Sequence, residues 1–78
     1  MDDWLSRRAD ALAERAGVPR SAFELSDADV NTLLELASRA AHESGERTNA
    51  PLLCFLIGAA TRGPKNVDEL AEIVKSTS

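Results

Sequence analysis

The chain has 78 residues, of which 44% are hydrophobic and 28% charged, and its formal net charge at pH 7 is −4. This length allows one domain at most, with a thin core and little room for a deep substrate cavity. The acidic balance argues against nucleic acid or an anionic membrane surface as the main partner, because both attract basic faces.

The first predicted helix covers residues 3–16. Its apolar residues, from Leu5 to Ala16, recur at i, i+4, i+7 and i+11 and therefore share one helical face. Asp2 or Asp3 can cap its first turn, where the helix dipole favours acidic side chains. A glycine directly after the last turn predicts the end of the helix.

The second predicted helix covers residues 27–44. Ser26 and Asp29 have the spacing of a capping box, although glutamate or glutamine is usual at the second position. Glu35 and Arg39 are spaced i, i+4 and predict an ion pair on the exposed face.

The third predicted helix covers residues 51–62 and begins with Pro51, which suits a first helical turn. Residues 52–57 leave no polar face, so we expect this helix to be the central one, buried on all sides. The alternative is that one face remains uncovered and serves for association. Gly58 lies in mid-helix, and we expect another backbone to approach it closely.

The fourth predicted helix covers residues 67–75, with Asn66 and Glu69 at capping-box spacing. The sequence has no alternating apolar run, no tyrosine and few β-branched residues, so strands are not predicted. The sequence therefore predicts an all-α fold, a compact four-helix domain that occupies residues 1–78 as a single unit.

No catalytic or cofactor motif is recognisable. The single cysteine, Cys54, and the single histidine, His42, do not have the spacing of a zinc site. Cys54 lies in the most apolar segment and is expected to be a buried, unreactive core residue, with a Cys54–His42 pair as the alternative. We therefore expect no enzyme, no cofactor and no metal.

One candidate binding site precedes the third helix. His42, Arg47 and Asn49 come close to its predicted N-terminus, where free N–H groups and the helix dipole favour an anion. The alternative is structural: Asn49 or Thr48 caps the helix, and Arg47 is solvated. On the second helix, His42 falls away from the apolar stripe, so we expect it at the surface.

The sequence also predicts a cytoplasmic protein. One cysteine cannot form an internal disulfide, and an acidic start is unlike a signal peptide. The longest apolar run, residues 50–60, is too short to span a bilayer.

The chain contains Trp4-Leu5 near its start, the step Ala41-His42, and the apolar run of residues 50–60 with its Pro-Leu and Phe-Leu pairs. Together these motifs resemble a small helical domain of unknown function from GC-rich bacteria. Some members of that family are fused to, or encoded beside, the molybdenum-cofactor guanylyltransferase or the formate dehydrogenase accessory protein. The resemblance implies an accessory role in the maturation of molybdenum-cofactor enzymes.

These observations lead to two functional hypotheses. The first is a non-enzymatic interaction or accessory module that binds a larger protein or itself. The alternative is a domain that binds a phosphate or nucleotide at the N-terminus of the third helix. A helix-turn-helix regulator is disfavoured, because the second and fourth predicted helices each carry only one Lys or Arg.

Overall fold

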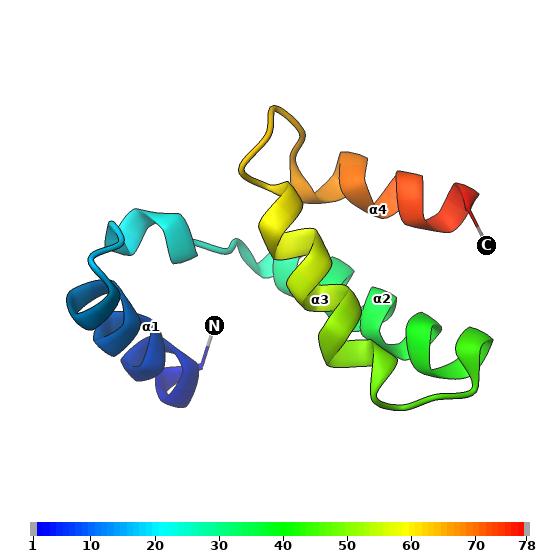
Figure 1. The fold of residues 1–78 in the computed structure, drawn as a ribbon, viewed down its shortest axis with the longest axis horizontal. Helices are drawn as coiled ribbons and strands as arrows, with labels where there is room; N and C mark the ends of the chain where they lie inside the picture. Colours follow the sequence, from blue (N-terminus) through cyan, green and yellow to red (C-terminus); the bar gives the residue numbers. More distant parts are fainter. Residues whose placement is uncertain (1, 78) are drawn as a thin grey trace. The chain divides into compact units, whose positions relative to one another are not determined.

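The computed structural model describes residues 2–77, which form α-helices and one short 3-10 helix (Figure 1). The described range contains no strand and four α-helices, which confirms the predicted all-α class. The contacts divide the chain into two units, one ending at Val30 and one beginning at Asn31. In chain order the elements are α1 (Asp3–Ala16), η1 (Arg20–Phe23), α2 (Asp27–Ser44), α3 (Asn49–Ala60) and α4 (Val67–Ser76).

Helix α1 begins and ends where the sequence predicts. The Asp2 carboxylate accepts a hydrogen bond from the Leu5 N–H at 2.8 Å and satisfies one free donor of the first turn. Gly17 follows the helix in the left-handed conformation, with φ 70°, and its N–H donates to the Ala13 carbonyl. This is the usual glycine ending of a helix.

The N-terminal unit is thinly packed. Helix α1 packs against η1, and Ala9 is the one buried residue that the structure describes in this unit. The Arg20 Nε donates to the Asp10 carboxylate at 2.6 Å and thereby links η1 to α1. The large apolar side chains of α1 are exposed, namely Trp4, Leu5 and Leu12.

Helix α2 begins with the predicted capping box. The Asp29 N–H donates to Ser26 Oγ at 3.0 Å, and the Ser26 N–H donates to the Asp29 carboxylate at 3.4 Å. Aspartate therefore replaces the usual glutamate in this motif, with one longer bond because its side chain is shorter. Gly45 follows the helix in the left-handed conformation, with φ 73°.

The predicted ion pair between Glu35 and Arg39 is wrong. Arg39 instead binds Glu43, one turn further along α2, with 3.1 Å between Nε and Oε2. Glu35 lies 3.7 Å from the Lys75 ammonium group on α4. Arg39 has a carboxylate one turn away in each direction, and the approach of α4 engages one of them. Such exposed pairs contribute little to stability.

Helix α3 covers Asn49–Ala60 and therefore begins and ends two residues earlier than the predicted 51–62. Within residues 46–50, two N–H groups donate to carbonyls three residues earlier, both at 3.1 Å, so the chain is already turning before Pro51. At the other end, the N–H groups of residues 62–63 also bond three residues back and tighten the chain into a turn.

Helix α4 covers Val67–Ser76, one residue beyond the predicted 67–75. Its predicted capping box is confirmed. The Glu69 N–H donates to Asn66 Oδ1 at 2.9 Å, and the Asn66 N–H donates to Glu69 Oε1 at 3.1 Å. The capping box therefore satisfies two of the free N–H groups at this helix start.

The core of the C-terminal unit is a small cluster to which three helices contribute. Leu36 of α2, Ile57 of α3, and Leu70 and Ala71 of α4 are its buried members, and Leu36 is only 1% exposed. Partly buried side chains pack around the cluster, namely Leu33, Leu53 and Val74. This cluster fixes which side of α3 faces inward.

The prediction that α3 is buried on all sides is wrong. Ile57 is 5% exposed, but Leu52 is 60%, Phe55 73% and Leu56 62% exposed. Within the C-terminal unit, α2 and α4 meet α3 on the side of Ile57, and neither covers the opposite side. The expected close contact at Gly58 is also absent, since a Cβ built there meets nothing within 4 Å among the described residues.

Candidate functional site

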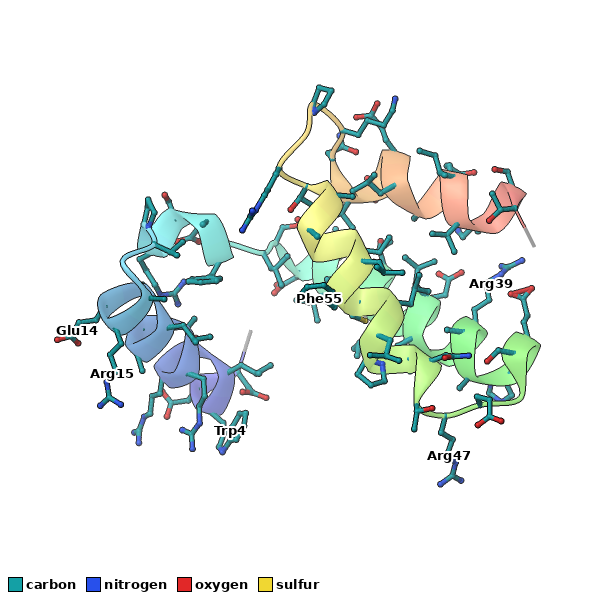
Figure 2. The ribbon with its side chains drawn as sticks, in the orientation of Figure 1. Trp4, Glu14, Arg15, Arg39, Arg47 and Phe55 are labelled. Atoms are coloured by element: carbon teal, nitrogen blue, oxygen red, sulfur yellow. The ribbon has the colours of Figure 1, made fainter. Side chains whose placement is uncertain are left out.

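The three residues of the predicted anion site have separate surroundings. His42 is exposed in the last turn of α2, and its Nδ1 donates to the Ser38 carbonyl oxygen at 2.8 Å on the same helix. Arg47 is exposed in the turn between α2 and α3 and points away from the helices (Figure 2). Asn49 is the half-buried first residue of α3.

The N-terminus of α3 offers few free donors. The Asn49 and Ala50 N–H groups donate to carbonyls of the preceding turn, and Pro51 has no N–H. Thr48 lies at the cap position in helical conformation, and its side chain makes no capping hydrogen bond. An anion needs several converging N–H groups at a helix start, so this geometry removes the main physical premise of the predicted site.

Cys54 and the acidic side chains are further groups that could carry chemistry. The Cys54 side chain is half-buried rather than fully buried as predicted, because it lies at the border between the two sides of α3. Among residues 2–77, no group of three or more His, Cys, Asp and Glu side chains is placed to hold a metal ion.

The exposed side of α3 is the most distinctive surface of the C-terminal unit. Leu52, Phe55, Leu56 and Ala59 are spaced i, i+3, i+4 and i+7 and therefore form one stripe along the helix. The three large side chains are each more than half exposed, and Phe55 projects from the helix in Figure 2. These four residues are called the α3 stripe below.

A shallow apolar groove borders the α3 stripe, with a volume of about 290 Å³. It runs between the last turns of α2 and the first turns of α3, and Leu52 and Leu56 belong both to the groove and to the stripe. The other lining residues are Ala40, Glu43, Ser44, Asn49 and Leu53. Of the predicted site residues, Asn49 alone lines this groove.

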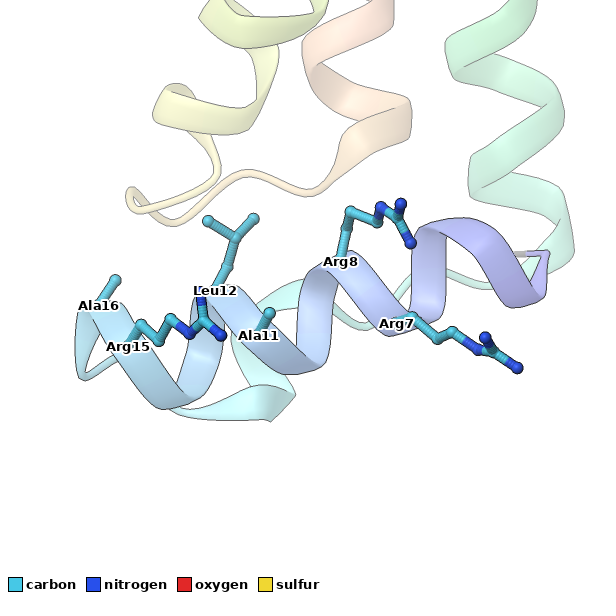
Figure 3. A pocket seen from close by; sticks show the side chains of 6 residues that line it. All are labelled: Arg7, Arg8, Ala11, Leu12, Arg15 and Ala16. Atoms are coloured by element: carbon cyan, nitrogen blue, oxygen red, sulfur yellow. The ribbon is translucent and has the colours of Figure 1, made fainter.

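A second hollow lies beside α1 and is lined by six residues of that helix (Figure 3). Its volume is about 510 Å³, but one helix cannot provide opposing walls for a ligand. Two of its arginines are already engaged, Arg7 with the Asp3 carboxylate at 3.1 Å and Arg8 over the Trp4 ring at 4.1 Å. This hollow is therefore a weaker candidate than the α3 stripe.

Sequence reasoning identified the α3 stripe only as an alternative. The signal was an all-apolar helix in a chain with few other helices to cover it. The order of the apolar residues cannot show which of them are covered, because that depends on where Leu36 and Leu70 of the neighbouring helices lie.

A family model described as Domain of unknown function (DUF6457) matches residues 1–78. The chain belongs to this family. The match agrees with the resemblance of its motifs to a helical domain of unknown function. No curated protein and no solved structure matches this DUF6457 chain. Within residues 2–77, no helix combines the length and the apolar character needed to cross a membrane.

Proposed function

We propose that this DUF6457 domain is a non-enzymatic protein-interaction module that binds its partner through the α3 stripe. The observation that carries the proposal is the exposure of Leu52, Phe55 and Leu56 on one side of a helix without charged residues. Contiguous exposed apolar patches on soluble proteins generally mark interaction sites, and a regular helical stripe fits a helix-in-groove interface.

The energetic basis of the proposal is apolar burial. Covering a leucine or phenylalanine side chain contributes about 1.5–3 kcal/mol when the side chain starts fully exposed. Three such side chains can provide the central hot spot of an interface, while the charged residues around them supply the polar rim. The neighbouring groove offers Leu53 and Ala40 as additional contact surface.

The proposed partners follow from the family resemblance. We infer an accessory role in the maturation of molybdenum-cofactor enzymes in the cytoplasm of a bacterium. The molybdenum-cofactor guanylyltransferase and the formate dehydrogenase accessory protein are the proteins to test first. The supporting argument is the gene association of the similar domains, together with a surface suited to docking on a larger protein.

The test is a binding titration with a matched pair of variants. Leu56 on the α3 stripe is 62% exposed and Leu34 on α2 is 64% exposed, so aspartate at either site costs the fold little. Each purified partner is titrated with wild type, Leu56→Asp and Leu34→Asp. We expect Leu56→Asp to weaken binding at least ~10-fold and Leu34→Asp to bind like wild type.

Two results would contradict the proposal. If neither partner binds the wild-type chain, the link to molybdenum-cofactor maturation fails. If the two variants lose binding equally, the α3 stripe is not the contact surface. Phosphate or nucleotide binding remains the alternative function, and it has less support because the N–H groups of Asn49 and Ala50 are already bonded.

A further inference from the structure

We propose that the α3 stripe also pairs with the α3 stripe of a second copy of the chain, antiparallel and about a two-fold axis. This inference deepens the proposed function by naming one partner of the same surface, and it rests on the stripe being an interaction site. Three observations support self-pairing: the charge of α3, the distribution of large and small residues along it, and its exposed area.

Charge favours a second copy as the occupant. The chain carries a net charge of −4, so two copies repel each other over most of their surfaces. Helix α3 is the exception, because none of its residues from Asn49 to Ala60 is charged. Two such faces can meet without opposing like charges.

The charges just beyond α3 set the orientation. Arg62 and Lys65 follow the helix and are exposed, whereas Glu46 and Arg47 precede it and balance each other. Parallel pairing would bring the cationic ends of both copies together. Antiparallel pairing places each cationic end beside the neutral end of the other copy, which avoids this repulsion.

The distribution of residue size is self-complementary in the antiparallel arrangement. The stripe has a bulky end at Leu52 and a small end at Ala59, with Phe55 and Leu56 between them. An antiparallel two-fold pair places Leu52 of each copy against Ala59 of the other and Phe55 of each copy against Leu56 of the other, so the large side chain at one end fills the space over the small one. Gly58, next to Ala59, also has open space beside it, since a Cβ built there would meet nothing within 4 Å among the described residues.

The exposed area predicts a weak dimer. Three large side chains that are each more than half exposed leave roughly 400 Å² of apolar surface on each copy. Stable interfaces bury about 800 Å² per partner, so the stripe alone supplies about half of that. The dimer should therefore form at high protein concentration and dissociate on dilution.

The first experiment measures mass against concentration for the full chain. Sedimentation equilibrium between about 10 µM and about 1 mM should show the wild-type mass rising from the 8.4 kDa of one chain toward twice that value. Leu56→Asp should stay monomeric over the whole range, and Leu34→Asp should associate like wild type. The proposal is overturned if the wild-type chain is monomeric at every concentration. It is also overturned if both variants lose association to the same extent.

The second experiment tests the antiparallel orientation. In a Cys54→Ser background, one chain carries Leu52→Cys and another carries Ala59→Cys, and the two are mixed at the concentration where wild type associates. Mild oxidation should give mainly the mixed disulfide between positions 52 and 59, which mass spectrometry distinguishes from the two homodimers. Homodimers as the main products would show parallel pairing and overturn the proposed arrangement.

The outcomes separate this inference from the proposed function. A monomeric chain that binds a maturation protein in a Leu56-dependent manner would refute self-pairing and leave the proposed function standing. A chain that dimerises through the stripe but binds neither maturation protein would refute the proposed function and leave self-pairing standing. If the chain is monomeric and Phe55 is nevertheless protected from solvent, the stripe is covered within its own chain, and self-pairing is refuted.

Discussion

Gly45 and Gly58 have opposite roles, although both are glycines in or beside a helix. Gly45 has φ 73°, a left-handed conformation in which a Cβ is strained, and it ends α2. Gly58 lies in the regular part of α3, and a Cβ there would meet nothing within 4 Å. The sequence predicts the first role from its position after the helix. It cannot predict the open space over Gly58, because that depends on the placement of other helices.

We therefore expect alanine to have opposite effects at these two glycines. Gly58→Ala should raise the free energy of unfolding by about 1 kcal/mol, because alanine removes the glycine propensity penalty without a clash. Gly45→Ala should lower it by about 1 kcal/mol, because alanine must adopt a strained φ. Urea unfolding of dilute protein, below about 10 µM, measures the free energy of unfolding of both variants. A destabilising Gly58→Ala would reveal a close contact at this position in solution.

At the scale of the element, the helix starts of α3 and α4 differ in how far the sequence determines them. The capping box of Asn66 and Glu69 is local, so it could be predicted, as could the bounds of α1 and α2. The start of α3 depends on the turn over residues 46–50, whose bonds no short motif specifies. The same turn weakens the case for the predicted anion site, because the N–H groups of Asn49 and Ala50 donate to carbonyls within it.

The two helix starts should respond differently to loss of the cap residue. Asn66→Ala removes a side-chain acceptor that holds the Glu69 N–H at 2.9 Å, and it should lower the free energy of unfolding by about 1 kcal/mol. Thr48→Ala should change it by less than about 0.5 kcal/mol, since the Thr48 side chain makes no capping bond. Urea unfolding measures both values. Equal losses would mean that Thr48 caps α3 in solution, which would restore the structural role that the sequence first suggested for it.

At the scale of the whole molecule, the buried residues are unevenly divided between the two units. Among the described residues, the N-terminal unit buries Ala9, whereas the C-terminal unit buries two leucines, an isoleucine, a valine and an alanine. The sequence predicts apolar faces in both units, since α1 and α4 are both amphipathic. It does not predict this difference, because the amount of covered surface depends on how many neighbouring elements reach each face.

This difference leads to a last prediction, on local stability. Local opening requires less free energy where few apolar contacts are lost, so α1 should open more readily than α2. In hydrogen–deuterium exchange, amides in the middle of α1, around Ala9, should exchange at least ~10-fold faster than those around Leu36, after correction for intrinsic rates. The comparison is internal, because both sites are mid-helix and bonded to their own helix backbone.

Leu36→Ala provides the control: it should speed exchange in α2, α3 and α4 together, since Leu36 joins the cluster that includes Ile57 and Leu70. Equal protection of α1 and α2 in the wild-type chain would show that contacts from outside the N-terminal unit hold α1 in place. The boundary between the two units at Val30 would then have to be given up.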